Sequence, residues 1–166
     1  MNIKSRLTTL LILLFTVPLN AHATAYQKGY RALEIFDTQG MDLTPLWVKI
    51  WIVVATACFA AGLLFVKRHT IARWVVGGYA AGFMILVFSS VFGLVQLKLA
   101  GFNALIHIIF WSPSLYLLLK YRPFISSEIS AFSIWSGIIT VVMLFSFVFD
   151  IPYAVTFLNH VLFDLS

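Results

Sequence analysis

The chain has 166 residues, of which 61% are hydrophobic and only 10% charged, and its mean hydropathy is +0.98. Soluble domains are about 45–50% apolar and about 25% charged, so too few polar residues remain to cover a soluble globule of this length. These figures exclude most soluble enzymes and nucleic-acid-binding domains, and they predict a one-domain integral membrane protein. The formal net charge of +5 does not argue for a nucleic-acid partner, because many of the basic residues lie in short loops between apolar runs.

Residues 1–23 have the parts of a secretory signal peptide in the expected order. Two basic residues precede a short apolar stretch at 7–17, and the small residues Ala21 and Ala23 mark a cleavage site of the A-x-A type. The apolar stretch is too short to span a bilayer comfortably. We therefore predict a cleavable signal peptide, with an uncleaved signal anchor as the alternative, and both interpretations place residue 24 on the outer side of the membrane.

The segment 24–43 combines apolar and charged side chains at helical spacing. Tyr26, Tyr30 and Leu33 recur at intervals of four and three residues, with charged residues between them. Such a pattern is typical of an amphipathic helix that lies in the membrane interface. We expect this segment to rest on the outer face of the membrane.

Four long apolar runs follow, each close to the roughly 20 residues that cross a hydrocarbon layer about 30 Å thick. Lipid offers no water to the backbone, so these runs must be helical. The predicted fold is all-α, an integral membrane four-helix bundle preceded by a cleavable signal peptide. Pro152 is expected to interrupt the last helix and leave a short outer carboxy-terminal segment. The transmembrane domain is predicted at 44–166, with spans at about 45–66, 74–97, 102–119 and 129–149.

The basic residues predict how these spans are oriented. Loops rich in Lys and Arg remain in the cytoplasm, and the loops after the first and third spans are the basic ones. We expect a multi-pass protein of a bacterial inner (plasma) membrane, with both mature termini on the periplasmic side. The loop residues also explain the positive charge through contact with anionic lipid, which leaves no argument for nucleic acid. The basic loop residues are Lys67, Arg68 and Arg73 after the first span, and Lys120 and Arg122 after the third.

Small and polar residues fall on one stripe of each span, and membrane helices pack through such residues. We therefore expect these stripes to face the inside of the bundle. The residues predicted to pack helices are Gly78, Gly82, Ser89 and Gly93 in the second span, and Ser133 and Gly137 in the fourth.

Polar residues within the spans gather toward the predicted outer side. An ionisable group inside a span is a candidate site, and the imidazole of His107 is able to relay protons near neutral pH. The alternatives are that Lys49 extends to the headgroups, and that His107 bonds to Gln96 or to a backbone carbonyl. Helical spacing of 100° per residue places Asp150 roughly opposite the small-residue stripe of its span, toward the headgroups. The candidate ligand-binding residues are Lys49, Gln96, Asn103, His107 and Asp150.

Several chemistries are not predicted. His107 is the single histidine within a predicted span, which argues against a bis-histidine haem, and Cys58 is the single cysteine. We predict no catalytic residue, no metal ligand and no cofactor. The expected role is a non-enzymatic accessory or assembly subunit that binds membrane lipid and another membrane protein or a second copy of itself. The alternatives are a small transporter or ligand-binding protein with an outer-leaflet polar site, and a membrane enzyme with His107 as acid or base.

The predicted topology is tested by a reporter fused after Ser166. A periplasm-dependent enzyme such as alkaline phosphatase should be active there, because an even number of spans follows the exported amino terminus. A signal from a cytoplasm-dependent reporter at the same position would overturn the four-span count.

Overall fold

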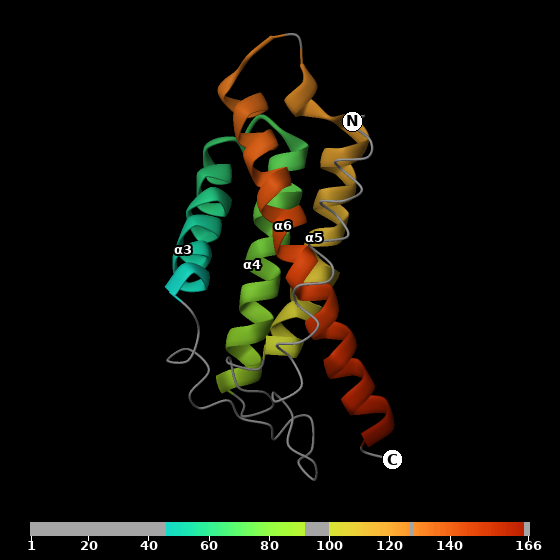
Figure 1. Ribbon diagram of the computed structural model, residues 1–166. Helices are drawn as coiled ribbons and strands as arrows, with labels where there is room; N and C mark the ends of the chain where they lie inside the picture. The colour runs from blue at the N-terminus through green and yellow to red at the C-terminus, as the bar shows by residue number, and fades with distance from the viewer. Residues whose placement is uncertain (1–45, 92–99, 127, 165–166) are drawn as a thin grey trace, which may run out of the picture.

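The computed structural model describes residues 46–91, 100–126 and 128–164. Within these ranges the chain is helical, and four helices are long and apolar enough to cross a membrane. They are α3 (Leu46–Ala61), α4 (Thr70–Val91), α5 (Ala100–Tyr121) and α6 (Ala131–Asn159), shown in Figure 1. The predicted signal peptide, the segment 24–43, Gly93 and Gln96 lie outside the described residues.

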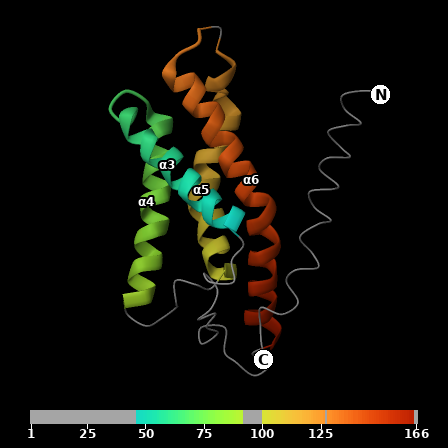
Figure 2. The same ribbon diagram turned by 60° about the vertical axis from the view of Figure 1, so that its left-hand side comes forward.

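The helices differ in length and in the part of the bundle that they cover. α5 and α6 run side by side in opposite directions, whereas α3 begins beside the middle of α6 (Figures 1 and 2). The ring of Trp47, in the first turn of α3, lies 5.8 Å from that of Phe149, far along α6. Beyond Phe149, α6 packs against α5, where Phe157 contacts Phe102.

Both basic loops lie at the same end of the bundle. The imidazole of His69, before α4, stacks on the ring of Phe132, at the start of α6, with ring centroids 3.6 Å apart. Arg73 reaches back into the α3–α4 loop and donates to the carbonyl oxygens of Val66 (2.8 Å) and Lys67 (3.3 Å). Aromatic stacking thus holds this loop against α6, and the charge-assisted hydrogen bonds hold it against the first turn of α4.

Large aromatic side chains fill the centre of the bundle. Phe59 of α3 is 1% exposed and packs against Tyr79 of α4 and Trp111 of α5, with centroid distances of 4.5 and 4.6 Å. Nearer the basic loops, the indole N–H of Trp135 donates to the carbonyl oxygen of Cys58 at 2.9 Å. The core therefore joins α3 to the other helices by ring packing and by a hydrogen bond that satisfies a buried indole.

A glycine pair brings α4 and α5 into close contact. A Cβ atom at Gly78 would overlap the carbonyl oxygen of Phe110, and one at Gly82 would lie 3.3 Å from Cγ2 of Ile106. Gly77, the adjacent residue, faces away, and a Cβ atom there would meet no atom within 4 Å. The close approach of the two backbones therefore depends on the missing side chain at Gly78.

The fourth helix is longer than the sequence predicts. It passes through Pro152 to Asn159 and continues as a π-helical turn at His160–Asp164, whereas the prediction ended the span near residue 149. Proline removes one backbone hydrogen bond, but ending the helix in an apolar environment would leave several groups unpaired. Packing also favours continuation, because Phe157 is buried against Phe102 of α5 with ring centroids 6.0 Å apart.

Serines cap the start of α6. The N–H of Ser133 donates to Oγ of Ser130 at 3.1 Å, and the N–H of Ser130 donates to Oγ of Ser133 at 2.9 Å. This reciprocal arrangement satisfies two donors at the helix start, as a capping box does. Further along, the hydroxyls of Ser136 and Thr140 donate to carbonyls of α6 itself. These hydroxyls therefore serve their own helix.

The glycine contact predicts different effects at two adjacent positions. Gly78→Val should destabilise the protein by roughly 1–3 kcal/mol or more, because the new side chain collides with the backbone of α5. Gly77→Val makes the same chemical change on the open side of α4 and should be nearly neutral. Thermal unfolding of both purified variants in detergent measures the difference, and equal melting temperatures would contradict the close α4–α5 approach.

Candidate functional site

Two ionisable side chains meet between α5 and α6. Nδ1 of His107 lies 3.3 Å from Oδ2 of Asp150. The side chains are 31% and 15% exposed, respectively, although each helix is otherwise strongly apolar. Removing a charged group from water is costly unless it has a partner, and each of these two residues supplies the partner of the other.

The antiparallel packing of α5 and α6 places His107 and Asp150 at the same level of the bundle. The Phe102–Phe157 contact fixes the register near the start of α5. From there, His107 lies five residues further along α5 and Asp150 seven residues back along α6, so both reach about the same level. The pair lies about 10 Å from the start of α5, at a rise of 1.5 Å per residue.

An indole ring supports the imidazole. The rings of His107 and Trp111, one turn apart on α5, stack with centroids 4.1 Å apart and an interplanar angle of 14°. Trp111 is 4% exposed and is itself held by Phe59 and Tyr79. The hydroxyl of Tyr79 lies 3.2 Å from that of Thr56 on α3. The plane of the imidazole is thus fixed by a chain of contacts that reaches α3 and α4.

This arrangement assigns different roles to the two imidazole nitrogens. In the neutral ring, Nδ1–H would donate to the Asp150 carboxylate and Nε2 would be an acceptor. When His107 is protonated, both nitrogens donate and the contact with Asp150 becomes an ion pair. The site is therefore able to exchange a proton, to bind a ligand through Nε2 or the carboxylate, or to act as a base.

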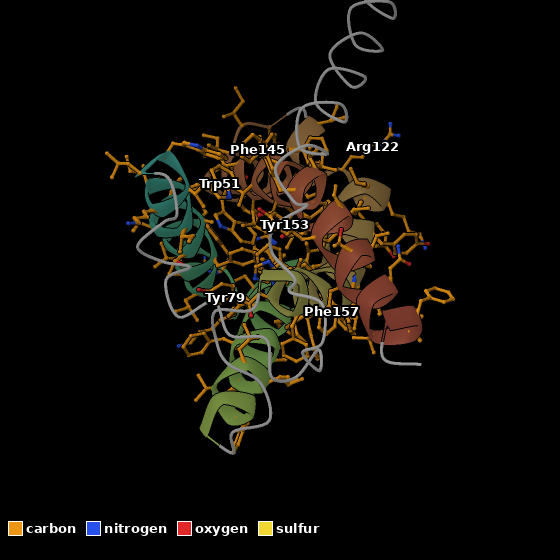
Figure 3. All side chains as sticks on the ribbon, turned by 60° about the horizontal axis from the view of Figure 1, so that its bottom comes forward. Trp51, Tyr79, Arg122, Phe145, Tyr153 and Phe157 are labelled. Carbon is orange, nitrogen blue, oxygen red and sulfur yellow. The ribbon has the colours of Figure 1, made fainter. Side chains whose placement is uncertain are left out.

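Aromatic residues also flank the α6 side of the pair. The indole N–H of Trp51 donates to Oγ of Ser146 at 3.5 Å, one turn before Asp150. The ring of Trp51 also lies 4.5 Å from that of Phe145. In Figure 3, viewed toward the carboxy-terminal end of α6, Trp51 and Tyr153 lie on the inner sides of their helices.

The structure brings together two of the five candidate ligand residues, His107 and Asp150. Asn103 lies one turn before His107 on α5 and is half-buried. Lys49 is half-buried in the first turn of α3, and no ion pair links it to Asp150 within the described part of the chain. Gln96 lies outside the described residues.

The residues predicted to pack helices differ in what they contact. Gly78 and Gly82 face α5, and Ser133 is buried in the cap of α6. Gly137 is half-buried, and a Cβ atom there would lie 3.4 Å from Cβ of Phe124. The side chain of Ser89 lies outside the described residues, as does Gly93.

The sequence-based alternative in which Asp150 faces the headgroups is wrong, because its carboxylate meets His107. It took the small polar residues as the centre of the inward face, but Ser133 and Thr140 lie at one edge of that face. The centre follows Ile139, Met143 and Ser146, and Asp150 continues this series at spacings of four, three and four residues. The hydroxyls of α6 bond to the backbone of their own helix, so they do not mark the side that faces the other helices. The spacing of the apolar residues marks that side and could have located Asp150.

Comparison with protein-family models, curated proteins and solved structures gives no match. The geometry of the His107–Asp150 pair is therefore the feature of the described residues that bears on function.

The coupling between the two side chains is measurable. His107→Leu and Asp150→Leu should each lower the free energy of unfolding by about 1–3 kcal/mol, because each leaves a partly buried polar group without its partner. The double variant should be more stable than the sum of the two losses predicts, with a coupling of about 0.5–3 kcal/mol. Unfolding in mixed detergent micelles provides the measurement, and strictly additive losses would contradict the pairing.

Proposed function

We propose that this is a small multi-pass protein of a bacterial inner membrane that binds a ligand at the His107–Asp150 pair, as a transporter or ligand-binding protein. The observation that carries the proposal is the meeting of the two ionisable side chains within apolar helices at 3.3 Å. Such groups are rare in membrane spans, and by default they mark ion, proton or substrate sites.

A purely structural role explains the pair less well. Ion pairs withdrawn from water are often no more stabilising than well-packed apolar side chains of similar volume. α5 and α6 already pack through apolar contacts such as Phe102 with Phe157. These features favour a pair in which His107 and Asp150 can release one another to bind a ligand or a proton.

The position of the pair fits exchange with the outer side of the membrane. The basic loops lie at the opposite end of the bundle, and the positive-inside rule assigns that end to the cytoplasm. His107 and Asp150 would then lie in the outer half of the membrane. A ligand from the periplasm would reach the pair without crossing most of the bilayer.

The other two roles differ in what they require of the pair. An accessory or assembly subunit needs helix surfaces for its partner and does not need an ionisable pair. A membrane enzyme would use Nε2 of His107 as a base and would convert its ligand into a product. The ligand-binding role accounts for the pair directly, without a further reacting group.

The test is a thermal-shift screen of the purified protein with organic cations, organic anions and neutral lipids. At least one class should raise the melting temperature of the wild type, since a ligand at 100 times its Kd adds about 2.7 kcal/mol. The shift should be lost in His107→Gln and Asp150→Asn. His69→Gln and Glu128→Gln make the same changes near the basic loops and should retain it.

Two results would count against the proposal. A ligand that stabilises all four variants equally would bind elsewhere on the protein. If no class shifts the melting temperature while a pull-down from native membranes recovers a stoichiometric partner, the accessory-subunit role would replace the present proposal.

A further inference from the structure

We propose that the ligand of the His107–Asp150 pair is a weakly hydrated organic cation, bound at the Asp150 carboxylate in exchange for a proton. This inference rests on the proposed function and specifies its ligand class. It follows from the charge of the pair, from the rings around it and from the competition between two positive charges for one carboxylate.

The charge of the site provides the first step. Asp150 is the one acidic residue of the span Ala131–Phe163, and its partner is an imidazole. With neutral His107 the pair carries one negative charge, and with protonated His107 it carries none. The pair therefore has room for one positive charge, which either a proton or a cationic ligand supplies.

The titratable groups described on α3, α4 and α6 do not change the net charge of the His107–Asp150 pair. On α3, Lys49 forms no ion pair with Asp150 within the described part of the chain. On α4, the hydroxyl of Tyr79 lies beside Thr56. On α6, Tyr153 lies one turn beyond Asp150 and has a neutral phenol near pH 7. Within the described residues, His107 is the one ion-pair partner of the Asp150 carboxylate. When His107 is neutral, an anionic ligand would meet an uncompensated negative charge there, which disfavours anions.

The rings near the pair select the type of cation. Trp51 is half-buried and is held by Ser146 one turn before Asp150. The ring of Trp111 is covered by the imidazole of His107 and is not available to a ligand. Phe149 precedes Asp150 and packs against Trp47. Aromatic faces attract cations, and the attraction is strongest where the cation gives up little water. Small metal cations require several oxygen ligands, whereas the pair supplies a single carboxylate, so an organic cation fits better.

Proton exchange follows from competition for the same carboxylate. When the organic cation enters, the proton on the pair leaves to solvent, so the total charge of the site is unchanged. No covalent bond other than the N–H or O–H bond to this proton breaks. Cation affinity should therefore rise with pH, by up to about tenfold per unit, until the pair is deprotonated. By linkage, the bound cation lowers the affinity of the pair for protons to the same extent.

Tetraphenylphosphonium and tetraphenylborate have similar shapes and opposite charges, so together they test the ligand class. Equilibrium dialysis of the full chain in detergent between pH 6 and 9 should show tetraphenylphosphonium binding that tightens with pH. Tetraphenylborate should bind at least tenfold more weakly. Calorimetry in two buffers of different ionisation enthalpy should show up to one proton released per bound cation.

Variants assign the binding to the carboxylate. Asp150→Asn should weaken tetraphenylphosphonium binding at least tenfold and remove the proton release. Asp150→Glu keeps the charge and should retain binding within about tenfold, which separates loss of charge from loss of fold. Glu128→Gln is the matched control at the other end of the bundle and should bind as the wild type does.

Several results would overturn the inference. Binding that is unchanged in Asp150→Asn would show that the cation partitions elsewhere, and binding without pH dependence would exclude the exchange. If tetraphenylborate or another anion binds instead, and His107→Gln and Asp150→Asn abolish that binding, the cation assignment fails while the proposed ligand site stands. If both variants respond to every ligand as the wild type does, the proposed function fails as well.

Discussion

The inability of lipid to hydrogen-bond with the backbone is the constraint on which this structure depends. It explains why helices continue where the local sequence would interrupt them. α5 passes through Pro113 and α6 through Pro152, and nearby hydroxyls bond to carbonyls of the same helix. Ser112 donates to the carbonyl of Ile108, and Thr156 donates to that of Pro152. Much of the hydroxyl content of the spans thus supports single helices and is not available to join them.

The helices associate mainly through close packing of their side chains and backbones. Gly78 allows the backbone of α4 to approach that of α5, and Phe59, Tyr79 and Trp111 fill the space between α3 and its neighbours. Without a strong hydrophobic effect between helices in lipid, close packing and the few available interhelical hydrogen bonds supply the association. One of these bonds runs from the indole N–H of Trp135 to the carbonyl oxygen of Cys58.

The His107–Asp150 pair is embedded in this packing. The stack on Trp111 ties the orientation of the imidazole to the aromatic core, and the α5–α6 register sets its distance from the carboxylate. A change in the charge of the pair would therefore be felt by groups that also hold α3 and α4. This coupling gives a ligand or a proton a physical route to influence helix packing, because the core has little free volume.

The sequence by itself determined the helical class and the approximate positions of the four apolar runs, because length and hydropathy suffice for both. It also identified His107 and Asp150 as candidates, since ionisable groups stand out within apolar spans. Only the tertiary structure decided that these two meet, that Lys49 forms no ion pair with Asp150 within the described residues, and that α6 continues beyond Pro152. The physical reason is that these outcomes depend on helix register and on contacts such as Phe102 with Phe157, which join residues far apart in the chain.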